Sequence, residues 1–195
     1  MSTEAIEKLR KDIVFREQLR EQTLTFHSTW GLFSPREIDE GSRLLLSHID
    51  VNPTDDCLDL GCGYGPIGLT LARLAPQGHT TLVDKDFVAI EYSRKNIETN
   101  QIANAEALLS NGFSAIRDRR FDVIASNIPA KVGNELMGLF FYDAYMQLRA
   151  GGRLYVVTIN GLRDYIKRVF KEQFGNYAKL KQGKNYTVAM ATKQN

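Results

Sequence analysis

The fold is decided by residues 58–68, which read LDLGCGYGPIG. The run leaves an apolar segment, passes through glycines at alternating positions, and enters a helical segment that begins at Pro66. Proline suits the first turn of a helix, where a missing N–H costs least. Glycines let the turn adopt unusual dihedral angles and let its backbone approach a ligand closely. The stretch therefore predicts a strand, a ligand-binding glycine turn and a helix, in that order.

Around this turn, short apolar segments alternate with longer amphipathic ones, as strands alternate with helices. The strand candidates are residues 57–60, 80–84, 106–109, 121–126 and 153–159. The helix candidates are residues 66–75, 87–101, 133–149 and about 162–174, with an earlier one over about 36–49. Residues 177–182 and 185–192 flank a Gly-Lys turn and predict a closing antiparallel hairpin. The predicted fold class is α/β, with a mostly parallel, doubly wound sheet covered by helices on both faces.

The N-terminal residues predict a separate helical element. Residues 4–22 mix Ile6, Leu9, Ile13 and Leu19 with alternating charges, which is typical of an amphipathic helix. Glycine, serine and proline within residues 23–35 then predict a loop. We therefore divide the chain into an N-terminal helical extension, residues 1–23, and a single domain, residues 24–195.

Composition excludes several classes of protein. The chain has 195 residues, of which 43% are apolar and 25% charged, close to globular averages. No apolar run reaches the ~18–20 residues that span a bilayer, and the first residues lack the apolar core of a signal peptide. Cys57 and Cys62 cannot form a disulfide framework, and no cysteine or histidine cluster has metal-ligand spacing. We expect a reduced, cytoplasmic protein without a bound metal, as a monomer or small homo-oligomer.

Charge is unevenly distributed along the chain. Residues 149–195 carry ten Lys or Arg and two acidic residues, a net charge of +8, which leaves −6 on residues 1–148. Clustered cations favour a polyanionic partner because they release counterions from phosphates. The alternative is a solvated basic face without a partner. A basic C-terminal face that contacts nucleic acid is therefore a hypothesis to be tested.

Asp59 distinguishes between the classes of ligand that a glycine-rich turn can bind. The spacing of Gly63, Gly65 and Gly68 also fits dinucleotide-binding turns, so the glycines alone do not identify the ligand. A carboxylate two residues before Gly61 is a poor neighbour for a pyrophosphate and a good one for a cation. S-adenosylmethionine carries an ammonium and a sulfonium group and no phosphate, so Asp59 disfavours an NAD-dependent oxidoreductase.

The DLGCGYG run, residues 59–65, resembles the first motif of Rossmann-like S-adenosylmethionine-dependent methyltransferases. This resemblance implies that the motif binds S-adenosylmethionine, with S-adenosylhomocysteine as the product. The cofactor contacts that it implies are Asp59, Gly61, Cys62, Gly63, Tyr64 and Gly65.

The next strand candidate ends in acidic residues that suit a nucleoside. Asp84 stands about 20 residues after the glycines, where a carboxylate hydrogen-bonds a ribose diol. Lys85 and Asp86 follow it, near the expected adenine. Asp86 is at least equally suited to cap the helix that begins beside it. Asp84 is therefore the preferred residue to bind the ribose, which both a dinucleotide and S-adenosylmethionine contain.

A third candidate contact follows residues 106–109. Methyltransferases of this type often carry an aspartate here that accepts a hydrogen bond from the adenine amino group, and the carbonyl of Asn111 could replace it. Gly112 and Phe113 complete this candidate adenine contact. The alternative is that Asn111 is an ordinary turn residue before a glycine.

Residues 126–129, SNIP, resemble the Asn-Pro-Pro-aromatic loop of methyltransferases that act on planar amino groups, namely those of guanine, adenine or a glutamine amide. Such a nitrogen is a weak nucleophile because its lone pair is delocalised. The side-chain oxygen of Asn127 and a backbone carbonyl stiffened by Pro129 could accept its two N–H groups and so align it. Ile128 and Ala130 replace the family's more common proline and aromatic residue. The alternative is a plain strand-to-helix turn built on Pro129.

Upstream, residues 31–34, GLFS, and residues 39–46, DEGSRLLL, extend the resemblance. Together these motifs resemble the small-domain methyltransferase family, which includes the catalytic half of the small-subunit ribosomal RNA guanine-N2 methyltransferases and single-domain archaeal relatives. The resemblance implies a seven-stranded Rossmann-like sheet whose last strand is antiparallel, with Phe33 and Asp39 helping to wall the cofactor pocket. The family's ribosomal RNA enzymes carry an additional N-terminal domain without a counterpart here, so substrate recognition is not implied.

The hypothesis that the residues favour is methyl transfer to an exocyclic amino group of an RNA base, guanine N2 in ribosomal RNA. The alternatives are a methyltransferase for a protein glutamine amide or a small molecule, and a non-catalytic module that binds S-adenosylmethionine or RNA. Trp30 and Tyr64 could stack on bases or simply pack, and Lys131 could meet a phosphate.

Overall fold

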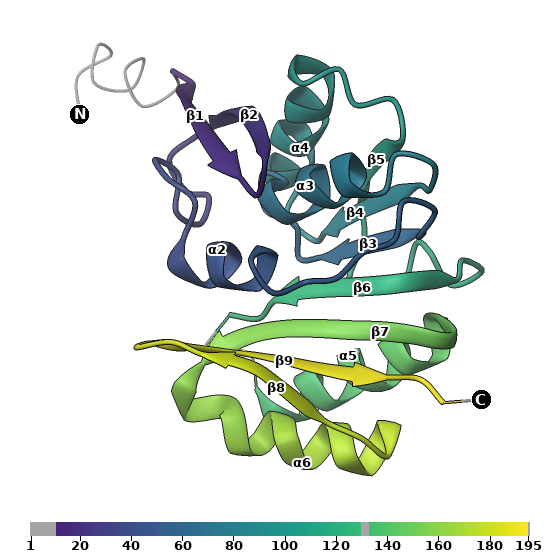
Figure 1. The fold of residues 1–195 in the computed structure, drawn as a ribbon. Helices are drawn as coiled ribbons and strands as arrows, with labels where there is room; N and C mark the ends of the chain where they lie inside the picture. The colour runs from purple at the N-terminus through teal and green to yellow at the C-terminus, as the bar shows by residue number, and fades with distance from the viewer. Residues whose placement is uncertain (1–10, 130–132, 195) are drawn as a thin grey trace.

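The structure is a computed structural model and describes residues 11–129 and 133–194. Within these residues, nine strands alternate with or precede the helices (Figure 1). The strands are β1 (Ile13–Leu19), β2 (Gln22–Ser28), β3 (Cys57–Leu60), β4 (Thr80–Asp84), β5 (Ala105–Leu109), β6 (Phe121–Asn127), β7 (Leu148–Ile159), β8 (Ala178–Gln182) and β9 (Tyr186–Thr192). The helices are α2 (Glu40–Leu46), α3 (Pro66–Leu74), α4 (Phe87–Thr99), α5 (Asn134–Gln147), the short 3-10 helix η1 (Asn160–Leu162) and α6 (Arg163–Phe174).

Seven of the strands form one sheet in the order β5-β4-β3-β6-β7-β9-β8. Pairing is parallel from β5 to β7, and β9 is antiparallel to both of its neighbours, β7 and β8. The predicted α/β class, the seven-stranded sheet and the antiparallel last strand are therefore confirmed. The chain winds outward from β3 to β4 and β5, then returns to β6 on the other side of β3. This reversal creates a switch point between β3 and β6, where open α/β sheets bind ligands.

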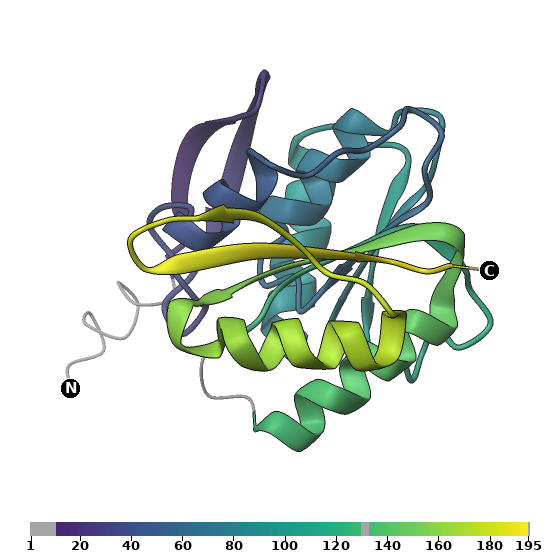
Figure 2. The same ribbon diagram turned by 60° about the horizontal axis from the view of Figure 1, so that its bottom comes forward.

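Helices cover both faces of the sheet (Figures 1 and 2). One apolar cluster joins the sheet to α2, α3 and α4 and includes Leu45, Leu71 and Ile90. The other joins it to α5 and α6 and includes Phe141 and Phe170, whose rings meet edge to face. The central strands alternate between the two clusters and are buried on both sides, which explains their continuous apolar sequences.

The predicted helix over residues 4–22 is wrong for the part that the structure describes. Residues 13–28 form the antiparallel hairpin β1-β2, and residues 1–10 lie outside the described residues. Along β1, partly buried and exposed side chains alternate strictly, the period of a strand rather than a helix. The predicted domain boundary between residues 23 and 24 falls inside β2.

Tertiary contacts explain why this segment is a hairpin. The side chains of Asn96 and Asn100 on α4 exchange hydrogen bonds with the backbone of β2 at His27 and Thr25. Phe26 is fully buried in the same cluster as α3 and α4. These partners lie some seventy residues away in sequence, so the local charge alternation could not reveal them.

The predicted loop over residues 23–35 is wrong for residues 23–28, which belong to β2, and the elements predicted after it lie where expected, with shifted ends. Strands β3 and β4 match their predicted bounds, whereas β7 begins at Leu148 instead of residue 153 and takes the last two residues predicted for the preceding helix. A register shift in the pairing with β6 and a positive φ of 77° at Gly151 accommodate this early start. Across residues 11–129 and 133–194, no helix is both long and apolar enough to cross a membrane.

Candidate active site

The carboxyl ends of β3, β4 and β6 meet at one edge of the sheet, because these strands are parallel neighbours. The glycine turn leaves β3 there, Asp84 ends β4, and Asn127 ends β6. The structure therefore brings together the three main predicted contacts, which are separated by up to 68 residues of sequence.

The glycines of the turn perform two different tasks. Gly61 and Gly63 have positive φ values of 77° and 56°, and a Cβ atom on either would meet no atom within 4 Å. Gly65 and Gly68 instead pack tightly, and a Cβ on Gly68 would lie 2.3 Å from Leu82 Cγ. The first pair thus exposes bare backbone to open space, as a ligand cradle requires, and the second pair lets α3 lie close to β4.

Asp59 is the most unusual ionisable group at this edge. Its side chain is 1% exposed, and Oδ2 accepts a hydrogen bond from the backbone N–H of Gly68 at 2.7 Å. Oδ1 is buried, and no donor from the described residues reaches it. Burial, opposed by the Gly68 hydrogen bond and reinforced by the charge of Asp84, raises the pKa of Asp59 to about 7. A buried carboxyl group with one unused oxygen fits a cationic or N–H-rich ligand group.

Asp84 holds the turn from the neighbouring strand. Its Oδ2 accepts from the backbone N–H of Gly63, and its Oδ1 from that of Asp86, both at 3.0 Å. A carboxylate offers about four acceptor sites, so two remain for hydroxyl groups. Asp86 caps α4 by accepting from the N–H of Val88, as the capping alternative predicted, and Lys85 is exposed.

Two predicted cofactor residues point their side chains into the protein. The hydroxyl of Tyr64 donates to the backbone carbonyls of Ser34 and Glu37, at 3.0 and 3.1 Å, and its ring packs edge-on against Phe26. Cys62 is buried, which raises the pKa of its thiol, and lies 3.5 Å from the hydroxyl of Ser93. The packing interpretation of Tyr64 is confirmed, and both residues can face a ligand only through their backbone.

The turn after β5 separates its predicted contacts. Asn111 is exposed, and its backbone carbonyl accepts from the N–H of Ser114 at 3.3 Å, which makes it a turn residue with an accessible side chain. Gly112 has a φ of 57°, and Phe113 is buried in the α5–α6 cluster. The side chain of Phe113 therefore packs in the core under the turn, whereas that of Asn111 is accessible.

The loop after β6 holds Asn127 in a specific orientation. The side-chain amide nitrogen of Asn127 donates to Oδ2 of Asp39 at 2.9 Å and to Oγ of Ser42 at 3.0 Å. The backbone N–H of Ile128 donates to the carbonyl of Val157 at 3.0 Å. Ser42 escaped the sequence analysis as a site residue, although it belongs to the DEGSRLLL motif.

Several other predicted site residues are exposed at the surface or lie outside the described residues. Pro129 is exposed, whereas Ala130 and Lys131 lie outside the described residues. Phe33 is 67% exposed, and Trp30 is 44% exposed beneath the guanidinium of Arg36, which lies 4.4 Å from the centre of its ring. The loop that carries both aromatic residues is tied to the glycine turn by the Tyr64 hydroxyl.

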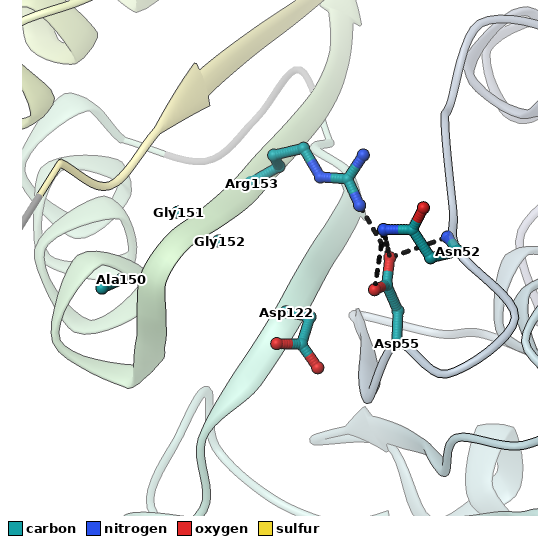
Figure 3. A pocket seen from close by; sticks show the side chains of 7 residues that line it. All are labelled: Asn52, Asp55, Asp122, Ala150, Gly151, Gly152 and Arg153. Atoms are coloured by element: carbon teal, nitrogen blue, oxygen red, sulfur yellow. Dashed lines mark hydrogen bonds and ion pairs between the residues drawn. The ribbon is translucent and has the colours of Figure 1, made fainter.

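The opposite edge of the sheet contains a polar hollow of about 360 Å³ (Figure 3). Arg153 reaches into it and pairs with Asp55 at 2.6 Å, while Arg149 pairs with Asp56 and Asp122. Two of the cations that predicted a basic face are thus bound to carboxylates far from the glycine turn. A separate groove of about 400 Å³ between α6 and β8 is lined by Lys167, Lys179 and the ion pair of Arg163 with Asp164.

No group of three or more His, Cys, Asp or Glu side chains within the described ranges could hold a metal ion. The residues that could hold an organic cofactor are instead those around the glycine cradle. A buried carboxyl oxygen without a partner among the described residues, bare glycine backbone and a second carboxylate with free acceptor sites together fit a nucleoside that carries an amino acid group.

Comparison with solved structures agrees with this geometry. The T. thermophilus 16S rRNA N2 G1207 methyltransferase (RsmC), solved in complex with AdoMet and guanosine, matches 93% of this chain at 30% identity with a TM-score of 0.83. The match covers 50% of that protein, so the chain spans half of its length. A methyltransferase from Pyrococcus furiosus matches 85% of this chain and 91% of its own, at 23% identity and a TM-score of 0.67. M. jannaschii TYW2, solved in complex with AdoMet, matches 93% of this chain and 86% of its own, at 14% identity and a TM-score of 0.66.

The last two likenesses show the fold alone, and the family follows from the sequence. Residues 23–190 match the family model described as the methyltransferase small domain, which confirms the resemblance seen in the motifs. The chain therefore belongs to the methyltransferase small domain family, whose members take their methyl group from S-adenosylmethionine.

Proposed function

We propose that this S-adenosylmethionine-dependent methyltransferase methylates an exocyclic amino group of an RNA base, guanine N2 in ribosomal RNA. The observation that carries the proposal is the position of Asn127, at the end of β6 and next to the cofactor cradle at the end of β3. The 30% identity with RsmC, an enzyme with this activity, supports the same substrate class. A ribosomal RNA substrate would also agree with the cytoplasmic localisation expected from the sequence.

The residues at the sheet edge divide the work of binding the cofactor. Asp59 and the bare backbone at Gly61 and Gly63 would hold its methionine end, and Asp84 would accept hydrogen bonds from its ribose hydroxyls. The exposed side chain of Asn111 would face the adenine. S-adenosylmethionine, when bound, supplies a methyl group that is already activated by a sulfonium. The protein therefore contributes alignment and electrostatic placement rather than activation of the donor.

The acceptor nitrogen needs help, because its lone pair is delocalised into the base. Asn127 can accept one of its two N–H groups through Oδ1, since the amide nitrogen of Asn127 is already engaged. Accepting these hydrogen bonds orients the nitrogen and favours the lone-pair geometry that attacks a methyl group. Pro129, directly after Ile128, restricts the backbone that would accept the second N–H.

An RNA base can reach this edge only if it is unpaired or flipped out of its helix. The exposed rings of Trp30 and Phe33 offer stacking surfaces near the turn. Lys167 and Lys179, in the groove between α6 and β8, are the cations of the predicted basic C-terminal face that we assign to the RNA backbone.

The substitution Asn127→Ala tests the proposal. The protein is incubated with radiolabelled S-adenosylmethionine and ribosomal RNA or small subunits, and methyl transfer is compared with wild type. We expect a loss of about 10²-fold or more, which is the size of effect that misplacing a reacting group produces. Calorimetry with S-adenosylmethionine checks that the variant still folds and binds. Equal transfer by both proteins would remove Asn127 from the reaction, and no transfer by wild type to any RNA would contradict the proposed substrate.

A second candidate substrate is a glutamine amide of a protein. It is favoured by the pairing of Arg149 and Arg153 with carboxylates, which leaves fewer cations for RNA than the sequence suggested. The two candidates differ in the salt dependence of RNA binding, because each phosphate contact adds about one unit to the slope of log K against log[salt]. A slope near zero would favour the protein substrate. Binding of S-adenosylmethionine and RNA without methyl transfer would indicate a non-catalytic module.

A further inference from the structure

The side-chain amide of Asn127 has both of its N–H groups occupied by one short segment of the chain. Oδ2 of Asp39 and Oγ of Ser42 lie 2.9 and 3.0 Å from Nδ2 of Asn127, and both belong to the start of α2. A carboxylate accepts hydrogen bonds and donates none, so Asp39 can face only the nitrogen end of the amide. No donor among residues 11–129 and 133–194 binds Oδ1 of Asn127 in the structure.

We propose that Asp39 and Ser42 are positioning residues that fix which end of the Asn127 amide faces the substrate. This inference rests on the proposed function, in which Oδ1 of Asn127 accepts an N–H of the target amino group. An asparagine amide without such partners can rotate by half a turn and present its NH₂ instead. In that orientation it would oppose a substrate N–H with another donor and lose the hydrogen bond. The acidic group at position 39 removes this second orientation.

Asp39 and Ser42 lie 88 and 85 positions before Asn127 in sequence, and the local structure at the start of α2 explains how they are held against it. Asp39 is the N-cap of α2, and the same Oδ2 atom accepts from the backbone N–H of Ser42 at 3.2 Å. The carboxylate is thus held by the helix start before it meets Asn127. A Cβ on Gly41 would lie 3.0 Å from Oδ2, so the glycine of the DEGS motif leaves room for the carboxylate.

Four variants distinguish a positioning role of Asp39 and Ser42 from a role in folding. Asp39→Ser keeps a good N-cap residue but shortens the side chain, so that its oxygen can cap the helix and no longer reach Asn127. Asp39→Asn keeps a side-chain oxygen at the same reach without the charge. Ser42→Ala removes the second acceptor. Ser47→Ala is the matched control, because its hydroxyl, also in the α2 region, donates to the carbonyl of Arg43 and lies away from Asn127.

The first readout is methyl transfer at saturating S-adenosylmethionine, beside the affinity for S-adenosylmethionine measured by calorimetry. We expect Asp39→Ser to lower kcat by about 10²-fold, which matches a misplaced reacting group. Ser42→Ala should lower it by about 3- to 10-fold, the worth of one hydrogen bond. Asp39→Asn should fall between them, and Ser47→Ala should match wild type. The affinity for S-adenosylmethionine should stay within about twofold in all four, since the contact is with Asn127.

The second readout needs no substrate and therefore distinguishes a failure of this inference from a failure of the proposed function. Hydrogen exchange of the Asn127 side-chain amide is followed by NMR, with the exposed Asn111 as the internal reference. In wild type the Asn127 amide protons should exchange more slowly than those of Asn111, and in Asp39→Ser they should exchange as fast.

Two results would overturn the inference. One is an Asn127 amide that exchanges like Asn111 in the wild-type protein, which would show that the contacts do not hold it in solution. The other is an Asp39→Ser variant that loses affinity for S-adenosylmethionine in proportion to its loss of kcat, which would make Asp39 a cofactor ligand. If wild type methylates no RNA while its Asn127 amide is protected and becomes exposed in Asp39→Ser, the orientation stands and the substrate assignment fails.

Discussion

Aspartate side chains lie at both ends of the central strands, but they have different partners at the two ends. At the amino edge, arginines pair with the carboxylates, as Arg153 does with Asp55 and Arg149 with Asp56. At the carboxyl edge, Asp59 and Asp84 receive only backbone N–H groups, and neither forms an ion pair with a basic side chain of the described residues.

The pKa values follow this difference. Burial raises the pKa of Asp56, but the hydrogen bond and charge of Arg149 outweigh it and leave that pKa below its ordinary value. Burial raises the pKa of Asp59 to about 7, with no cation to oppose it. The amino edge has completed its charge pairs within the chain and serves stability, whereas the carboxyl edge leaves a carboxyl group available to a cationic ligand.

Removing the charge of Asp59 should have the largest effect on cofactor binding. Asp59→Asn should weaken binding of S-adenosylmethionine by about 2–5 kcal/mol, the usual cost of losing one partner of a buried charge pair. Calorimetry measures this loss. Urea denaturation without ligand should show no fall in the unfolding free energy at pH 8, because the variant no longer buries a charge. Unchanged affinity for S-adenosylmethionine would contradict the difference between the two edges.

The pH dependence of binding should report the same group. If the amino group of S-adenosylmethionine pairs with the ionised form of Asp59, as we propose, its affinity should rise by about tenfold per pH unit up to about pH 7 and then level off. Calorimetry between pH 5 and 8 measures this trend. A profile in Asp59→Asn that keeps the same slope would assign the titration to another group.

Stability without ligand should change in the opposite direction. The pKa of Asp59 is raised on folding from 3.8 to about 7, so the folded state binds more protons across this interval. The contribution of Asp59 to the unfolding free energy is therefore most favourable below pH 4 and falls as pH rises toward 7. The unfolding free energy of wild type minus that of Asp59→Asn, from urea denaturation, isolates this contribution. It should fall as pH rises from 4 to 7, and a rise over that range would refute the prediction.

Breaking a charge pair at the amino edge should affect stability and spare the cofactor. Arg153→Ala leaves the mostly buried carboxylate of Asp55 without its cation and should lower the unfolding free energy by about 1–3 kcal/mol. Affinity for S-adenosylmethionine should match wild type, because this pair lies at the other end of the strands. A variant that keeps its stability but loses the cofactor would invert the roles of the two edges.

The smallest expected effects concern RNA. Lys167→Ala and Lys179→Ala, in the groove between α6 and β8, should each lower the slope of log K against log[salt] by about 1. Arg149→Ala is the matched control, because its guanidinium already pairs with Asp56 and Asp122. Filter binding over a salt series measures the slopes. Equal slopes for all three variants and wild type would exclude this groove as the phosphate contact.

The central strands and the glycine turn could be predicted from sequence because their signals are local. β3 and β4 begin and end where their apolar runs do, and the backbone geometry that Gly61 and Gly63 permit is a property of each glycine alone. The hairpin β1-β2 could not be predicted, because its charge alternation also suits a helix. The contacts that favour the hairpin, from Asn96 and Asn100 on α4 and from the buried ring of Phe26, are distant in sequence.

The features of the candidate site also fall into those that the sequence predicted and those that only the structure revealed. The sequence alone determined the order of the strands and helices from β3 onward, the glycine turn, and the acidic and amide residues at the strand ends, because each is set by neighbours within a few positions. The tertiary structure alone decided that Tyr64 points inward, that Arg149 and Arg153 are paired, and that Asp39 and Ser42 hold Asn127. Side-chain orientation and charge pairing depend on partners brought together by the sheet, and no local pattern encodes those partners.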